Sequence, residues 1–128
     1  MLDIIKSHAN RAPQSVALQG NNDAVLGYGD FLAEIYQAQA QLNNKAPVAL
    51  AMDNDPAWVV LDIACMANHI PLVPLPGFFS DAQLKHAVLD AGASILITDN
   101  PDRFATIFAG LITQKTTLKV ASRLLMQF

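Results

Sequence analysis

The chain has 128 residues, which is the length of a single domain and is enough to bury a hydrophobic core. Hydrophobic residues make up 52% of it and charged residues 15%, so the composition excludes a largely disordered protein. The formal net charge is −3 and the few lysines and arginines are scattered, which excludes the basic surface of a nucleic-acid-binding protein. We predict one domain over residues 1–128.

The sequence predicts a cytoplasmic protein without a membrane span. The single cysteine, Cys65, cannot form an internal disulfide, so no oxidising compartment is required. The first six residues mix polar and apolar side chains and do not resemble a signal peptide. The longest apolar stretches, residues 58–67 and 70–75, are too short or too interrupted to cross a bilayer.

The first third of the chain predicts a helix, a hairpin and a second helix. In chain order these are a helix that starts near Leu2 and ends before Pro13, strands at 15–19 and 24–27 around a turn at 20–23, and a helix that carries Phe31, Ile35, Ala38 and Leu42. Gly27 is the expected N-cap of the second helix, and Asp30 stands where a carboxylate suits the positive end of the helix dipole. Residues 43–47 are expected to end it.

The middle of the chain predicts a buried strand over residues 48–52 and then a buried helix. We expect Asp55 to cap this helix and Pro56 to occupy its first position, because the N–H that proline lacks would have no helical partner there. Residues 58–67 are apolar nearly all round, so the helix should be buried on more than one side. Asn68 is expected to take the left-handed position that ends it.

The rest of the chain continues the alternation of strands and helices. Residues 70–75 are extended, and their two prolines predict an irregular or edge strand. The further elements are a helix with the capping-box pair Ser80 and Gln83 and the stripe Leu84, Ala87, Val88 and Ala91, ended by Gly92; a strand at 94–98; a helix from Asn100-Pro101 that carries Phe104, Ile107, Phe108 and Leu111; and a strand at 116–121. Residues 122–128 are apolar without a pattern. The order predicts an α/β fold, a mostly parallel sheet flanked by helices.

Motifs for nucleotides and metals do not occur. The glycines, at 20, 27, 29, 77, 92 and 110, form no phosphate-binding loop, and a helix start explains Gly27-Tyr28-Gly29. His8, His69 and His86 have no spacing that pairs them on one helix face, and a helix end is expected between Cys65 and His69. We assign no metal ligand and interpret Cys65 as a small core residue.

An acidic loop is the sharpest candidate for chemistry. Asp53-Asn54-Asp55 follows a strand, where open α/β sheets place ligands. Together with Thr98-Asp99 and Lys119, this loop is similar to the acidic phosphoacceptor pocket of a response-regulator receiver. The comparison fails because the intervening strand ends in Leu75-Pro76-Gly77, without an aspartate to phosphorylate. We therefore interpret Asp55 as a helix cap, and Asp53 and Asp99 as turn residues.

The serines of the sequence do not indicate nucleophilic catalysis. The serines, at 7, 15, 80, 94 and 122, lack a nucleophile-elbow context, and Ser80 is explained as a cap. Trp58 and the phenylalanines fall on helical stripes and are expected in the core. The residues by themselves indicate an α/β domain to which we assign no catalytic, cofactor-binding or metal-binding residue.

Several segments of the chain occur in an order and at spacings that identify a protein family more specifically than any single segment does. They are residues 4–18, Leu26-Gly27-Tyr28-Gly29-Asp30-Phe31, Val48-Ala49-Leu50-Ala51-Met52-Asp53-Asn54, residues 58–75, residues 80–91 and Ser94-Ile95-Leu96-Ile97-Thr98-Asp99. Together they resemble the start of the adenylate-forming (AMP-binding) ligase superfamily. The stretch Phe78–Leu84 looks most like that of acyl- or aryl-CoA synthetases. The departures are Gly27, where the family usually has Ser or Thr, and Asn68-His69, where it usually has Ala-Gly or Gly-Ala.

This resemblance implies the N-terminal subdomain of a ligase whose parent reaction joins a carboxylate to AMP and then forms a thioester. The parent would use ATP, magnesium and CoA. The family's phosphate-binding loop, magnesium-binding Glu, ribose-binding Asp and catalytic Lys lie beyond the region of resemblance and have no counterpart here. No catalytic residue is therefore carried over, and we expect no cofactor in this chain.

Two hypotheses follow for the function. The first is an N-terminal ligase fragment, inactive alone, whose partner is the remainder of the parent. It predicts an exposed apolar face, through which the chain would also form homo-oligomers. The second is a standalone, non-catalytic α/β binding or scaffold domain, which predicts a stable monomer with its own pocket or partner. An independent small enzyme is disfavoured because no reactive constellation was found.

Overall fold

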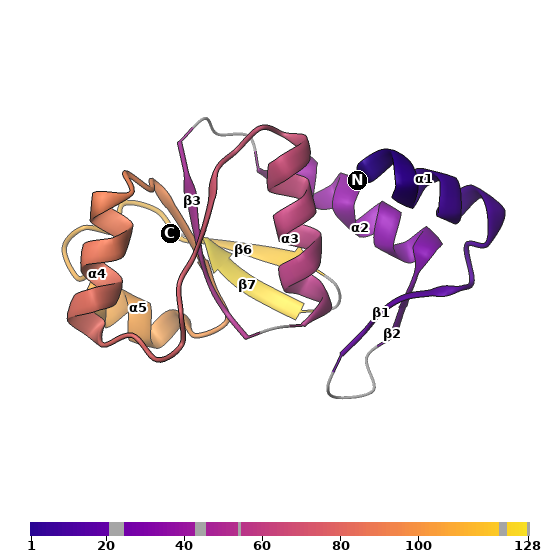
Figure 1. The fold of residues 1–128 in the computed structure, drawn as a ribbon. Coiled ribbons are helices and arrows are strands. Elements are labelled where there is room, and N and C mark those ends of the chain that lie inside the picture. Colours follow the sequence, from indigo (N-terminus) through magenta and orange to yellow (C-terminus); the bar gives the residue numbers. More distant parts are fainter. Residues whose placement is uncertain (21–24, 43–45, 54, 121–122, 128) are drawn as a thin grey trace. The chain divides into compact units, whose positions relative to one another are not determined.

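The computed structural model describes residues 1–20, 25–42, 46–53, 55–120 and 123–127 (Figure 1). In chain order its elements are α1 (Leu2–Arg11), β1 (Val16–Gln19), β2 (Val25–Gly27), α2 (Tyr28–Gln41), β3 (Val48–Ala51), α3 (Pro56–Ala67), β4 (Leu72–Pro74), α4 (Asp81–Asp90), β5 (Ile95–Thr98), α5 (Pro101–Ile107), β6 (Thr116–Val120) and β7 (Arg123–Gln127). They fall into two compact units. Unit 1 holds α1, β1, β2, α2 and α3, and unit 2 holds β3, β4, α4, β5, α5 and most of β6 and β7. The single domain over residues 1–128 stays a prediction.

In unit 1, the predicted helix, hairpin and second helix are confirmed. β1 and β2 pair antiparallel, with Leu18 opposite Leu26. Gly27 is the N-cap of α2 and has an extended backbone. A Cβ on Gly27 would lie 3.0 Å from the carbonyl oxygen of Pro13, so a side chain at this position would require the Pro13 backbone to move slightly. The turn predicted at 20–23 and the helix end at 43–47 lie mostly outside the described residues.

Helix α3 begins as its sequence predicts. Asp55 is its N-cap, and the Asp55 carboxylate accepts a hydrogen bond of 2.7 Å from the N–H of Ala57. Pro56 occupies the first turn. The residues of α3 that are buried are Pro56, Ala57, Val60, Leu61, Ile63, Ala64 and Cys65. Burial around most of its circumference fits a helix that is apolar nearly all round.

The end of α3 differs from the prediction that Asn68 is left-handed. Asn68 has φ −90°, and the left-handed residue is His69, with φ 57°. The Asn68 side chain is used instead for long-range bonds. Its amide donates to the backbone oxygens of Gln39 and Leu42 at 3.0 and 2.8 Å, and its Oδ1 accepts from Gln39 Nε2 at 3.1 Å. These bonds hold the end of α3 to the end of α2 and leave the left-handed turn to the next residue.

The sheet of unit 2 has the strand order β4-β3-β5-β7-β6. β3 pairs parallel with both β4 and β5, which confirms the parallel core of the predicted α/β fold. β4 is an edge strand, as its prolines predicted. The strand predicted at 116–121 is β6, but it is not the last one. β7 follows it, lies between β5 and β6, and pairs antiparallel with β5, with Thr98 opposite Met126.

Helices α4 and α5 pack with the strands of unit 2 around one core. α4 begins with the predicted capping box, in which Ser80 Oγ accepts from the N–H of Gln83 and Gln83 Oε1 accepts from the N–H of Ser80. The core combines strand, loop and helix residues: Ala49, Ala51, Leu75, Leu84, Val88, Leu96, Phe104 and Phe108. α5 is shorter than predicted, because it ends at Ile107 and the chain turns at Gly110, with φ +83°. Leu111 therefore lies outside the helix.

Candidate functional site

The carboxyl ends of β3, β4 and β5 meet at one edge of the unit 2 sheet, because these strands are parallel. A crevice of about 230 Å³ opens at this edge, and we call it the carboxyl-edge crevice. It is lined by Ala51, Met52, Asp53, Leu75, Pro76, Gly77, Leu84, Asp99, Asn100, Arg103 and Phe104. Open α/β sheets bind ligands at this position, outside the carboxyl ends of the strands. The crevice is therefore the candidate functional site.

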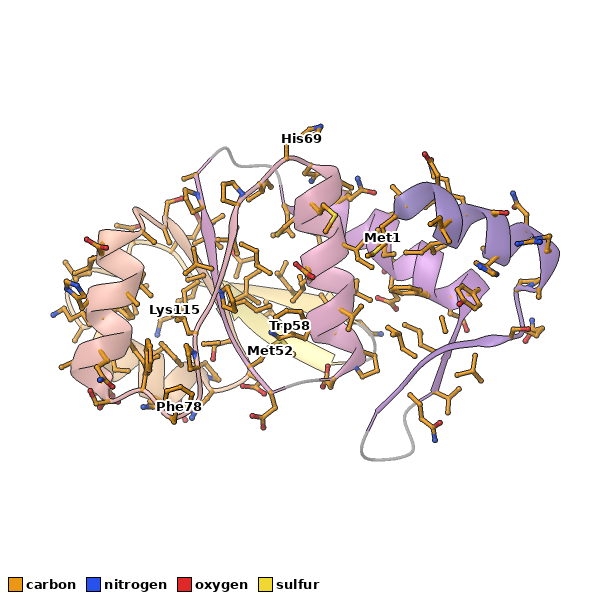
Figure 2. The ribbon with its side chains drawn as sticks, in the orientation of Figure 1. Met1, Met52, Trp58, His69, Phe78 and Lys115 are labelled. Carbon is orange, nitrogen blue, oxygen red and sulfur yellow. The ribbon has the colours of Figure 1, made fainter. Side chains whose placement is uncertain are left out.

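The crevice has an apolar floor and a polar rim. Its buried members, Ala51, Leu75, Leu84 and Phe104, belong to the unit 2 core. Its exposed polar members are Asp53, Asp99 and Asn100. Figure 2 labels Met52, a lining residue that follows β3. It also labels Phe78, an exposed residue of the loop between β4 and α4 that is not part of the lining. Such a surface suits a small molecule with an apolar body and hydrogen-bond donors directed at the carboxylates.

Arg103 on α5 is already engaged with the first residue of α4 and with the loop before it. Its Nη2 lies 2.9 Å from Asp81 Oδ1, its Nε donates to the same oxygen at 3.0 Å, and its Nη2 also donates to the backbone oxygen of Phe79 at 3.2 Å. The guanidinium lies 5.9 Å from the centre of the Phe104 ring. These contacts link α5 to the start of α4 and fix this wall of the crevice.

The turn between β5 and α5 is fixed by a buried hydroxyl. Thr98 is fully buried, and its Oγ1 accepts a hydrogen bond of 3.0 Å from the N–H of Asn100. The hydroxyl thereby pairs with one of the backbone N–H groups at the start of α5 that have no partner within the helix. This bond holds Asp99 and Asn100 at the rim of the crevice.

The structure gathers some of the predicted acidic residues and separates others. Asp53 and Asp99, predicted as turn residues, both line the crevice, whereas Asp55 caps α3 as predicted. Lys119 is exposed on β6 and is not among the lining residues. The sequence grouped Asp53 with Asp99 only in the comparison with a receiver pocket, and when that comparison failed it left both as turn residues without a shared crevice. The available signal was that each directly follows a strand of one parallel sheet.

Cys65 is a core residue of α3, as predicted. Its side chain is fully buried. Burial raises the pKa of the thiol to about 11, and the negative charge of Asp62 adds to this increase. The thiol therefore stays protonated at neutral pH, and a protonated buried thiol is a poor nucleophile and a poor metal ligand.

The histidines lie in three separate environments. His8 on α1 stacks on Tyr28, with ring centres 4.9 Å apart, His69 follows α3, and His86 is exposed on α4. Within the described ranges, no group of three or more His, Cys, Asp or Glu residues is placed to hold a metal ion. Nor does any helix in those ranges have the length and apolar character needed to cross a membrane.

Comparisons with known proteins agree on one family. The family described as AMP-binding enzyme matches residues 5–126. No curated protein matches the sequence. A putative long-chain-fatty-acid CoA ligase from Rhodopseudomonas palustris superimposes with a TM-score of 0.75 at 19% identity, over 87% of this chain and 30% of that one.

Two further solved structures show the same fold. The inhibitor-bound N-terminal domain of FACL13 from Mycobacterium tuberculosis has a TM-score of 0.71 at 17% identity, over 87% of this chain and 30% of that one. The N-terminal subdomain of NpsA from Klebsiella oxytoca, in complex with anthranilyl-AMSN, has a TM-score of 0.67 at 22% identity, over 78% and 27%.

The present chain thus spans less than a third of the length of each of these structures. The family match extends over almost all of the chain, and the fold of the match is the α/β arrangement described above. The chain therefore belongs to the AMP-binding enzyme family and has the fold of the N-terminal subdomain of its adenylate-forming ligases.

Proposed function

We propose that this chain is the N-terminal part of an AMP-forming acyl- or aryl-CoA synthetase. The parent reaction joins a carboxylate to ATP, releases pyrophosphate, and then transfers the acyl group from AMP to the thiol of CoA. The main support for this proposal is the family match over residues 5–126 together with the shared fold. The CoA ligase from R. palustris supports a thioester product, and the NpsA complex with anthranilyl-AMSN supports an aromatic acid as the alternative to a fatty acid.

We propose further that the chain does not catalyse adenylation by itself. The reaction develops negative charge on phosphate oxygens, and enzymes stabilise it with fixed donors, cations and magnesium. In this sequence the glycines are dispersed and no Pro-Lys-Gly loop occurs. Arg103, the cation at the candidate site, is bound to Asp81. ATP, magnesium and CoA would therefore bind only when the remainder of the parent supplies those groups.

The remainder of the parent is the proposed partner. Large apolar side chains are exposed on both units, which supports contact with further protein. In unit 1 they include Met1, Ile4, Val16, Val25, Tyr36 and Met66, and in unit 2 they include Phe78. We propose the cytoplasm as the compartment, because a lone buried thiol needs no oxidising environment. Cell fractionation that recovers the protein from the periplasm or from membranes would contradict this location.

ATP–pyrophosphate exchange tests the proposal. The chain alone and a form extended along its reading frame to the end of the parent are compared, with a panel of aliphatic and aromatic carboxylates. Reactions without carboxylate give the background. We expect exchange only from the extended form and only with one class of acid. When CoA is added to that form with the accepted acid and ATP, we expect the free thiol of CoA to be lost.

Each other result has a definite meaning. Exchange by the chain alone would show that it holds catalytic groups of its own. Absence of exchange from the extended form with every acid would contradict the ligase assignment and favour the non-catalytic binding or scaffold domain.

A further inference from the structure

Unit 2 contains a second pocket, at the end of β5 opposite the carboxyl-edge crevice. It has a volume of about 260 Å³ and lies between the end of α4, the start of β5 and the segment that follows α5. It is lined by Val88, Leu89, Ala93, Ser94, Ile95, Leu96, Phe108, Leu111, Ile112 and Thr113. We call it the Phe108 pocket.

The floor of the Phe108 pocket is made of core side chains. Val88, Leu96 and Phe108 are only 4–6% exposed. Leu89 and Leu111 are 56% and 53% exposed, so they leave apolar surface in contact with water at the rim. An apolar hollow of this kind gains free energy when an apolar occupant displaces its water.

The walls of the pocket are held by backbone turns. The chain reverses after α4 at Gly92, with φ +68°, and after α5 at Gly110, with φ +83°. Backbone hydrogen bonds close both turns, from the N–H of Ala93 to the oxygen of Val88 at 3.2 Å and from the N–H of Leu111 to the oxygen of Phe108 at 2.9 Å. The hollow is therefore formed before any occupant enters, which lowers the cost of binding.

The lining residues determine the chemistry of the occupant. None of them carries an ionisable side chain, and Ser94 and Thr113 are the lining residues with a hydroxyl. A charged occupant would lose its hydration without gaining a counter-charge, and an inserted peptide would bring backbone groups that this lining cannot pair. Both arguments favour a free, neutral small molecule.

The volume determines its size. A cavity of about 150 Å³ holds benzene, and natural ligand pockets begin at about 300 Å³. We propose that the Phe108 pocket binds a small neutral molecule whose apolar body has the size of one substituted aromatic ring and whose polar substituent reaches Ser94 or Thr113. This proposal is independent of the ligase assignment.

A titration of the whole chain followed by methyl NMR tests the proposal. Phenol is the neutral probe, and benzoate and benzylammonium are charged probes of similar size. We expect saturable phenol shifts at Leu89, Leu111 and Ile112, with both charged probes binding at least about tenfold more weakly. Equal binding of the three probes, shifts elsewhere, or no saturable phenol binding would overturn the proposal.

Matched variants localise the binding. Ala93→Leu adds bulk inside the pocket, whereas Ala109→Leu adds the same atoms to an exposed residue outside it. We expect Ala93→Leu to weaken phenol binding about tenfold and Ala109→Leu to leave it unchanged. If Ala93→Leu does not give a native spectrum, Ser94→Leu replaces it. Unchanged phenol binding by Ala93→Leu, or by Ser94→Leu where it is used instead, would contradict the inference. A dimer in which Leu89 and Leu111 are protected would contradict it as well.

Discussion

Two polar side chains make hydrogen bonds with backbone groups at helix ends. Thr98 does so locally, because its hydroxyl accepts from the N–H of Asn100 two residues away. Asn68 does so at long range, because its amide donates to carbonyls of Gln39 and Leu42 at the end of another helix. A single buried polar group without a partner costs about 1–3 kcal/mol, so residues of this kind have a large effect on stability.

Replacing Asn68 should destabilise unit 1 more than its exposure suggests. Asn68→Ala removes both donors from the last carbonyls of α2, and we expect the free energy of unfolding to fall by about 1–3 kcal/mol. Asn10→Ala, on the exposed side of α1, is the control and should change it by less than about 0.5 kcal/mol. Urea unfolding measures both variants. Equal effects would show that the Asn68 bonds do not contribute to stability.

Cys65 should make stability depend on alkaline pH. The pKa of the thiol is raised from 9.0 to about 11 in the folded chain, mainly by burial. The unfolded chain therefore loses its proton first, so the contribution to stability is full below pH 9 and is lost as the pH rises toward 11. Over this window we expect the wild type to lose about 2 kcal/mol more than Cys65→Ala.

Urea unfolding of both proteins at several pH values from 8 to 11 measures this difference. Using the variant as reference removes the contribution of tyrosines and lysines, which titrate in the same window. Parallel pH profiles for the two proteins would contradict the buried, protonated thiol.

At the scale of elements, helix starts followed directly from the sequence. Asp55 with Pro56, and Ser80 with Gln83, cap α3 and α4 as predicted, because a cap depends on residues within one turn of each other. Helix ends were less predictable. α3 ends at Ala67 as predicted, but the left-handed residue is His69 because Asn68 makes tertiary bonds. α5 ends before Leu111 because the chain turns at Gly110.

The capping box of α4 should have a measurable effect on stability. Ser80→Ala removes the acceptor for the N–H of Gln83 and frees the Gln83 side chain. We expect the free energy of unfolding to fall by about 1 kcal/mol. Ser7→Ala, at an exposed position inside α1, should be neutral or slightly stabilising because alanine favours helices. If both substitutions have the same effect by thermal unfolding, the capping box is not responsible.

At the scale of the whole molecule, exposed apolar side chains predict self-association of the isolated chain. In unit 1, Met1, Ile4 and Met66 are 53–69% exposed, and a shallow hollow separates the start of α1 from the end of α3. A net charge of −3 opposes contact between copies only weakly. We therefore expect the average mass in light scattering to rise with concentration.

A pair of variants tests this origin of association. Met66→Lys places a charge in the apolar patch of unit 1 and should lower the average mass. Ala82→Lys adds the same charge at an exposed position on α4 and should not. Monodisperse monomers of the wild type at every concentration would contradict the prediction.

The sequence by itself determined the local structure of this protein, the alternation of its elements and its family. Periodicity, caps and turn residues act over a few neighbours, so the pattern around Phe31 or Ser80 predicts a helix wherever the helix packs. Tertiary structure decided what depends on distant partners. β7 enters the sheet between β5 and β6 because β5 offers it a free edge, and residues 122–128 carry no local signal of that pairing. Asp53 and Asp99 meet at one crevice only because parallel strands end at the same edge.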